Sequence, residues 1–122
     1  MSRMLLSIKP KYANKIISGE KKYEFRKFHC RTNVDTIVIY ASSPIKQIIG
    51  EVSIIEIIEG EKDEVWNRTK QNSGITKKDY KDYYKNKNSA VAYKLGQVTV
   101  YEEPIDISEV GLTYVPQSFA YI

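Results

Sequence analysis

The sequence contains a single cysteine, Cys30, and a single histidine, His29. One cysteine cannot form an internal disulfide, and a structural zinc site needs several cysteine or histidine ligands. We therefore expect no disulfide, no metal and no cofactor. A Ser-His-Asp triad would have to use His29. A Cys-His nucleophilic pair is disfavoured, because adjacent side chains on an extended segment point in opposite directions.

Long apolar runs are also missing from the sequence. No stretch approaches the roughly 18 consecutive apolar residues that a membrane-spanning helix needs. The apolar segment that follows Arg3 is too short for the central region of a signal peptide. We therefore expect a cytoplasmic protein that does not use a membrane.

What is present fits a folded globular chain. The 122 residues are 42% hydrophobic and 28% charged, which predicts one domain spanning residues 1–122. The formal net charge of +4 is mildly basic. It permits nucleic-acid binding through phosphate contacts but does not require it. The 10 tyrosines leave two interpretations open, because tyrosine stacks on bases and is also a common strand residue.

Hydrophobic periodicity predicts an alternation of strands and helices. Period-two patterns and β-branched runs predict strands at Arg3–Lys9, Lys21–Lys27, Thr36–Ala41, Gln47–Glu59, Ala90–Leu95 and Val98–Tyr101, the fourth bent near Gly50. Helical spacing predicts helices over Pro10–Ser18, around Val65 to Thr69, and from Thr76 to about Lys85. This order predicts an α+β fold, most simply a small mixed β-barrel flanked by short helices.

The stretch GEKKYEFRK, from Gly19 to Lys27, concentrates charge in one strand-length run. In an ideal strand Glu24 and Arg26 share one face, and Lys21 points to the other. Either Lys21 lies in a turn before the strand, where this alternation does not apply, or Lys22 is the lysine that shares a face with Glu24 and Arg26. The alternative is a solvated strand with surface ion pairs worth about 0–1 kcal/mol each.

The same stretch, preceded by a predicted helix, resembles the ASCH-domain signature G-x-K-x-x-E-x-R. The segments IVIYASSPIKQIIGEV and PQSFAYI resemble the same family, within a group described as predicted transcriptional regulators. The resemblance implies a PUA-like mixed β-barrel with a cleft between barrel and helices that binds RNA or another nucleic acid. Some members hydrolyse a modified cytidine nucleoside and others are nucleases, so the resemblance leaves binder and enzyme open.

Within this stretch we expect three ligand-binding side chains. Lys21 supplies a mobile cation for phosphate or for developing negative charge. Glu24 accepts hydrogen bonds from the amino group of a base, or acts as a general base. Arg26 orients Glu24 or binds a phosphate with its planar guanidinium. If the protein is an enzyme, Lys21 and Glu24 are its predicted catalytic residues, although the hydrolases of modified cytidine carry a threonine at the position of Glu24.

Two further segments are predicted to contribute to the site. One follows a buried strand, where hydroxyls and backbone N–H groups bind an anion or a base edge; its predicted residues are Tyr40, Ser42, Ser43 and Lys46. The alternative is an ordinary turn. The other is Gln117 with Ser118, near the aromatic Phe119, since an amide and an aromatic ring together recognise a base. The alternative is a C-terminal strand that seals the barrel.

The sequence leaves three functions open. The first is an RNA-binding or nucleic-acid-binding module, with a role in RNA metabolism or transcription-related regulation. The second is a small hydrolase, either an amidohydrolase of a modified cytidine or a ribonuclease. The third is a protein-interaction module with a regulatory role. The basic charge balance and the ASCH resemblance favour the first, with RNA or a nucleotide as partner.

Overall fold

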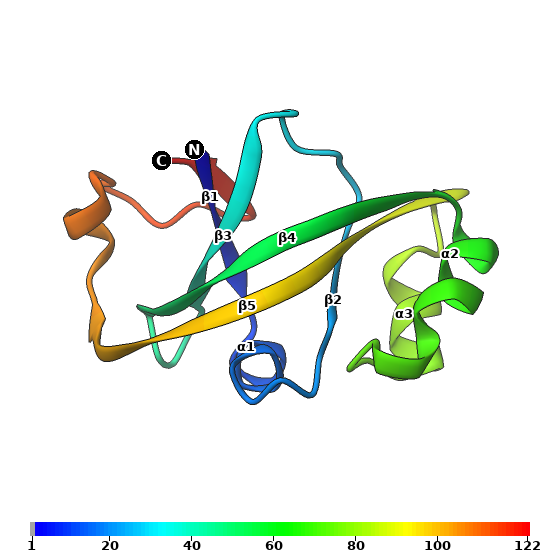
Figure 1. Ribbon diagram of the computed structural model, residues 1–122, viewed down its shortest axis with the longest axis horizontal. Coiled ribbons are helices and arrows are strands. Elements are labelled where there is room, and N and C mark those ends of the chain that lie inside the picture. Colours follow the sequence, from blue (N-terminus) through cyan, green and yellow to red (C-terminus); the bar gives the residue numbers. More distant parts are fainter. Residues whose placement is uncertain (1) are drawn as a thin grey trace.

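The chain forms one curled, six-stranded mixed sheet with three α-helices beside it, as described over residues 2–122 by a computed structural model (Figure 1). The strand order is β2-β5-β4-β3-β1-β6, in which only β1 and β3 are parallel neighbours. In chain order the elements are β1 (Ser2–Ile8), α1 (Pro10–Ile17), β2 (Tyr23–Arg26), β3 (Val34–Ala41), β4 (Gln47–Glu61), α2 (Lys62–Thr69), the 3₁₀ turn η1 (Lys70–Asn72), α3 (Lys77–Tyr83), β5 (Ser89–Ile105), the 3₁₀ turn η2 (Ile107–Val110) and β6 (Phe119–Tyr121).

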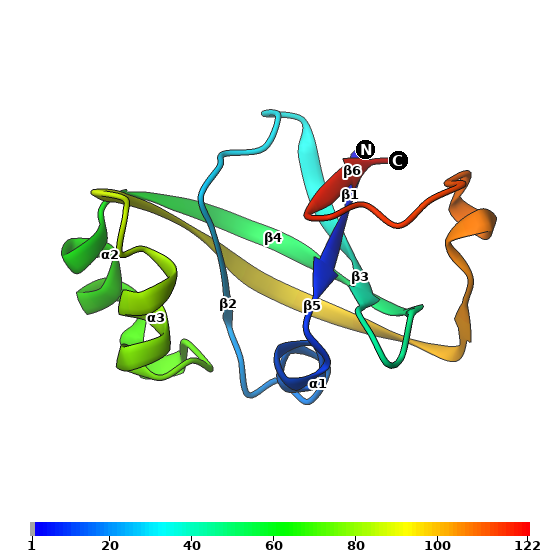
Figure 2. The same cartoon turned by 180° about the vertical axis from the view of Figure 1, so that it is seen from behind.

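Two long strands, β4 and β5, run the length of the molecule and give the sheet its curl (Figures 1 and 2). Their pairing shifts register at three places, one of them between Ile48 and Gly50, where the sequence predicts a bend. Such irregularities increase strand twist and bend the sheet. The result is the predicted α+β architecture in the form of a half-barrel.

The edge strands of the half-barrel, β2 and β6, are joined by side chains rather than by a backbone ladder. Arg26 on β2 donates a hydrogen bond from Nη1 to the Ser118 hydroxyl, with an N···O distance of 3.2 Å. Just beyond β2, the ring of Phe28 stacks on that of Phe119 with centroids 4.2 Å apart and an interplanar angle of 20°. These contacts bring the chain's last strand next to its second.

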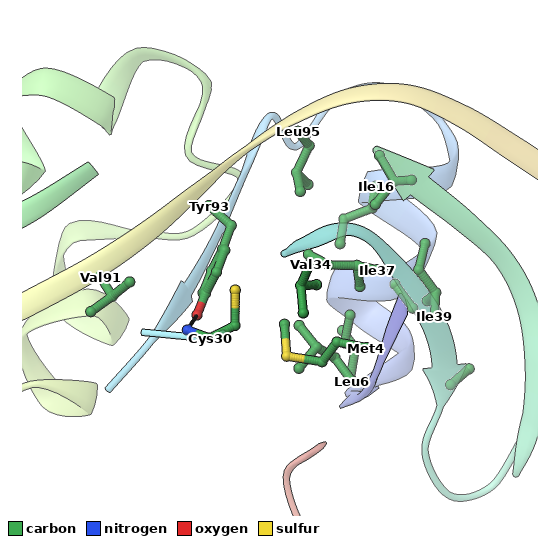
Figure 3. Close-up of a cluster of buried hydrophobic side chains, with 14 residues drawn as sticks. Met4, Leu6, Ile16, Cys30, Val34, Ile37, Ile39, Val91, Tyr93 and Leu95 are labelled. Atoms are coloured by element: carbon green, nitrogen blue, oxygen red, sulfur yellow. Dashed lines mark hydrogen bonds between the residues drawn. The ribbon is translucent and has the colours of Figure 1, made fainter. Parts of the chain in front are cut away.

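The main hydrophobic core fills the concave space between the sheet and α1 (Figure 3). Met4, Leu6 and Ile39 are fully buried there. The hydroxyl of Tyr93 points at the turn after β2, where it accepts a hydrogen bond from the Cys30 backbone N–H and donates one to the Phe28 carbonyl. Cys30 is 3% exposed, so this lone thiol belongs to the core.

A second cluster lies under α2 and α3 and contains Phe25, Val65, Tyr80 and Tyr84. The Tyr84 hydroxyl lies 2.6 Å from the Arg26 carbonyl oxygen, to which it donates, so α3 is tied to β2. A third cluster lies on the other side of the sheet, around Leu5, Val38, Tyr40 and Ile48. Tyr40, Tyr80 and Tyr84 are each at most 2% exposed, so these three are packing residues.

Several predicted boundaries differ from the structure, most clearly at β5 and β2. The predicted strands Ala90–Leu95 and Val98–Tyr101 are one strand, β5, because the intervening residues continue to pair with β4. The strand predicted over Lys21–Lys27 is shorter at both ends; before β2, the Lys22 backbone N–H donates to the Asn72 carbonyl, while the Lys22 carbonyl accepts from the Leu95 N–H of β5. Within residues 2–122, no helix has the length and apolar character to cross a membrane.

Packing of the sheet predicts a large difference between two chemically identical truncations. Ile39→Ala on β3 removes a side chain that is 0% exposed, and it should lower the free energy of unfolding by about 2–5 kcal/mol in urea denaturation. Ile55→Ala on β4 removes one that is 62% exposed and should change it by less than about 0.5 kcal/mol. Equal losses for the two variants would contradict this assignment of the core.

Candidate functional site

A cleft of about 580 Å³ opens where β2, the end of β1, α1 and α3 meet. Its lining combines aromatic rings with charges of both signs. The lining residues are Ser7, Ile8, Lys9, Lys11, Tyr12, Lys21, Glu24, Phe25, Arg26, Ile75, Asp79, Asp82 and Tyr83. Three residues predicted from the sequence, Lys21, Glu24 and Arg26, are therefore brought together in one hollow.

Lys21 lies in the turn between α1 and β2, so the alternation of strand side chains does not apply to it. Gly19 ends the helix region with φ +84°, a left-handed conformation that glycine adopts without strain. The Lys21 backbone N–H then donates to the Lys15 carbonyl. This turn aims the Lys21 side chain inward, where it is 3% exposed.

The loop that covers Lys21 requires a glycine. Gly74 has φ +68°, and a Cβ there would lie 2.5 Å from Cγ of Lys21. Ser73, just before it, accepts a hydrogen bond from the Lys21 ammonium at its carbonyl oxygen, with an N···O distance of 2.6 Å. The loop between α2 and α3 thus packs directly on the Lys21 stem.

Two aromatic rings lie beside the Lys21 ammonium. Its Nζ lies 5.1 Å from the ring centroid of Tyr12 and 5.0 Å from that of Phe25. Rings at this distance attract a cation. Burial nevertheless lowers the pKa of Lys21 to about 8, an effect that the nearby Glu24 carboxylate opposes. An amine with this pKa exchanges its proton close to neutral pH.

Glu24 and Arg26 form a buried ion pair on one face of β2. Both Nε and Nη2 of Arg26 lie 3.0 Å from the same oxygen, Oε2 of Glu24. Nη2 also donates to the Ser7 carbonyl at 3.0 Å, and Nη1 donates to Ser118. The two side chains are only 11% and 8% exposed. Arg26 therefore orients Glu24, as expected, while it also joins β2 to β1 and to the start of β6.

The helices supply residues that sequence analysis missed. The Tyr12 hydroxyl on α1 donates to Oδ2 of Asp79 on α3 at 3.4 Å, and Lys11 Nζ lies 3.7 Å from the same oxygen. These contacts bridge the cleft beside Lys21. Periodicity assigns such residues to helices, but which helix faces the cleft depends on packing between elements far apart in the sequence.

The other predicted residues lie outside the cleft lining. Tyr40 is 2% exposed and belongs to the third hydrophobic cluster. Ser42 follows β3 and donates its backbone N–H to the Ile8 carbonyl, while Ser43 and Lys46 are exposed in the turn to β4. Gln117 is exposed as well. Ser118 is connected to the cleft through Arg26.

Residues 6–99 match the ASCH domain. The chain belongs to the ASCH domain family. It is 30% identical over 120 residues to the large ribosomal subunit protein uL22 of Ureaplasma parvum, a match that covers 98% of this chain and 39% of that protein. It is also 30% identical over 92 residues to an ASCH domain-containing ribonuclease of Zymomonas mobilis, covering 75% of this chain and 62% of the ribonuclease.

Solved structures of ASCH from Zymomonas mobilis have the same fold. A tyrosine-to-phenylalanine variant superimposes with a TM-score of 0.90 at 26% identity, covering 100% of this chain and 91% of that one. The Zymomonas mobilis ASCH structure without a named substitution gives a TM-score of 0.89 at 27% identity. This match covers 98% of this chain and 87% of that one. The curled sheet and its helices are therefore the ASCH architecture. The chain spans about two fifths of the ribosomal protein and less than two thirds of the ribonuclease.

The buried ammonium predicts a pH dependence of stability. An unfolded lysine has a pKa of about 10.4, whereas Lys21 in the folded ASCH domain has a pKa of about 8. Between these values the unfolded chain binds more protons, so the free energy of unfolding rises with pH. Relative to Lys21→Met, the wild type should gain about 1–2 kcal/mol between about pH 7.5 and 9.5.

Urea denaturation across this pH range measures the difference. The buried tyrosines and Cys30 are the same in both proteins, so their titration cancels in the comparison. Parallel pH profiles for the wild type and Lys21→Met would show that the ammonium is solvated and would contradict the buried position.

Proposed function

We propose that this ASCH domain binds RNA or another single-stranded nucleic acid, with a nucleotide seated in the cleft. The observation that carries the proposal is the Lys21 ammonium, buried between the rings of Tyr12 and Phe25 at the wall of a 580 Å³ hollow. Its hydrogen bond to Ser73 uses one N–H, and an ammonium has further donors for a ligand oxygen. Burying a cation disfavours folding, so such a site is more typical of function than of stability.

The cleft offers complementary groups for each part of a nucleotide. Lys21 and the rim residues Lys9 and Lys11 suit phosphate oxygens. Glu24, held by Arg26, and Asp82 on the opposite side suit the amino groups of a base. A pocket of this size, apolar in part and with a few convergent polar groups, is the usual form of a small-ligand site.

The Zymomonas mobilis relative supports a nucleic-acid ligand, because a ribonuclease acts on RNA. Direct ligand contacts by Tyr40, Ser42, Ser43, Lys46 and Gln117 stay predictions, since these residues lie apart from the cleft lining. Transcription-related regulation, hydrolysis of a modified cytidine, a protein-interaction role and a cytoplasmic location also stay predictions.

Two neighbouring lysines provide a matched test of binding. Lys21→Met should weaken the affinity for a labelled RNA dodecamer about tenfold or more at low salt, the loss expected for one charge-assisted hydrogen bond. Lys22→Met removes the same charge one residue away, from an exposed side chain outside the cleft lining, and should change affinity less than about twofold. Fluorescence anisotropy measures both.

Two outcomes would count against the proposal. One is a wild-type protein that binds neither RNA, DNA nor nucleoside monophosphates at low salt. The other is an equal loss for the two lysine variants, which would mean that only net charge matters. Thermal unfolding of each variant establishes that it is folded.

A second candidate function is ribonuclease activity at the same site. The specific observation in its favour is the lowered pKa of Lys21, about 8, next to the carboxylate of Glu24. In this scheme Glu24 takes the proton of the ribose 2′-hydroxyl as that oxygen bonds to phosphorus. Lys21 gives its proton to the 5′-oxygen as the phosphorus–oxygen bond to it breaks. The products are a 2′,3′-cyclic phosphate and a free 5′-hydroxyl.

This scheme predicts cleavage of RNA but not of DNA with the same sequence, because DNA lacks the 2′-hydroxyl. Lys21→Met and Glu24→Gln should each lower the cleavage rate by about a hundredfold or more. The rate should fall as pH rises through about 8, where Lys21 loses its proton. Gel analysis of end-labelled RNA measures all three. RNA that binds and is not cut would exclude the ribonuclease and leave the binding function in place.

A further inference from the structure

The chain that leaves β2 presents cations to solvent beside the cleft. Lys27, His29 and Arg31 are exposed, while Phe28 and Cys30 between them turn inward. This segment, residues 27–31, connects β2 to the turn before β3 and lies on the same side of the molecule as β6 (Figure 2). It takes no part in the cleft lining.

Aromatic rings, not carboxylates, hold the cations of this segment. Lys27 Nζ lies 4.5 Å from the ring centroid of Tyr83, and Arg31 Cζ lies 4.0 Å from that of Tyr121. No ion pair found among residues 2–122 includes Lys27 or Arg31. A cation over a ring keeps its full charge. Both side chains are therefore positioned and still able to attract an anion.

Two of the cations that line the cleft differ in this respect. Arg26 is paired with Glu24, and Lys11 with Asp79. Their charge is largely neutralised within the protein. Cations outside any ion pair found among residues 2–122 therefore lie in the cleft, at Lys9 and Lys21, and also outside it, at Lys27 and Arg31.

This surface is continuous with the cleft at both of its sides. Tyr83, under Lys27, is itself a lining residue. Phe28 stacks on Phe119, which lies directly after Ser118, the partner of Arg26. Tyr121 lies on the same strand as Phe119, and its ring contacts the Arg31 guanidinium. We call Lys27 and Arg31, with the rings of Tyr83 and Tyr121 beneath them, the cationic track.

We propose that the cationic track binds the backbone of a single strand that continues out of the cleft, so that the ligand is an oligonucleotide and not a lone nucleotide. Single-strand binders combine positive charge along the backbone with aromatic rings that accept unpaired bases. Four peptide units separate Lys27 from Arg31, a reach of up to about 14 Å, which is more than one nucleotide. This inference rests on the proposed nucleic-acid binding at the cleft.

The test compares two ligands against two double variants. The ligands are a labelled single-stranded RNA dodecamer and the nucleoside monophosphates, measured singly. Lys27→Ala with Arg31→Ala removes the charge of the track. Arg68→Ala with Lys70→Ala is the matched control, because it also removes one lysine and one arginine, both exposed, from α2 and η1, outside the cleft lining.

We expect the track variant to bind the dodecamer about tenfold more weakly. The slope of log affinity against log salt should become shallower by about 1.4, because each of the two phosphates that the variant no longer neutralises accounts for about 0.7. Its mononucleotide affinity should stay within about twofold of wild type. The control should keep the wild-type slope for both ligands. Lys27→Arg with Arg31→Lys keeps both charges and should restore dodecamer binding.

A track variant whose dodecamer affinity and salt slope equal those of the control overturns the inference, and so does a parallel loss of mononucleotide binding. If dodecamer binding depends on Lys21 but not on the track, only the track fails. If the wild type binds neither ligand, both the proposed function and the inference about the track are contradicted. If the double variant shows no thermal unfolding transition, the single variants Lys27→Gln and Arg31→Gln are compared with the wild type in the same way.

Discussion

The half-barrel depends on the guanidinium of Arg26. β2 and β6 stand at opposite ends of the strand order, so no backbone ladder joins them. Arg26 reaches from β2 to the Ser7 carbonyl at the end of β1 and to the Ser118 hydroxyl before β6. A planar group with several fixed donors can serve these partners at once. Glu24 neutralises its charge, which makes burial of the pair tolerable, since an unpaired buried ion is strongly destabilising.

This arrangement also shapes the cleft. Because Glu24 and Arg26 are fixed on one face of β2, and Tyr84 ties α3 to the Arg26 carbonyl, the hollow between α1 and α3 has a rigid floor. Lys21 enters it from the preceding turn, under a loop whose Gly74 leaves no room for a larger residue. The protein thus holds one cation where water is scarce, and burial lowers its pKa.

Sequence patterns predicted much of this structure. Period-two and β-branched runs located β1 to β5, and helical spacing located α1 and α3, because both signals arise from burial of one face of an element. The break predicted at Gly96 was wrong, since pairing with β4 continues through it as part of β5. The composition of the turn after β3 predicted a site for an anion or a base edge; Ser43 and Lys46 are exposed there, apart from the cleft lining, and their contact with a ligand stays a prediction. The composition of a turn does not specify whether the turn lies beside a cleft that distant segments form.

By itself, the sequence determined the α+β class, the G-x-K-x-x-E-x-R run of the ASCH family, and the position of Glu24 and Arg26 on one strand face. The class follows from the order of local hydrophobic periods along the chain, and the shared face follows from the alternation of side chains along a strand. Only the tertiary structure decided where the Lys21 ammonium points, and that Tyr12, Asp79 and Tyr83 share its cleft. It also decided that Lys27 and Arg31 rest on rings more than 50 residues away. Contacts between such distant segments depend on how the sheet curls and where the helices pack, and no short sequence period encodes them.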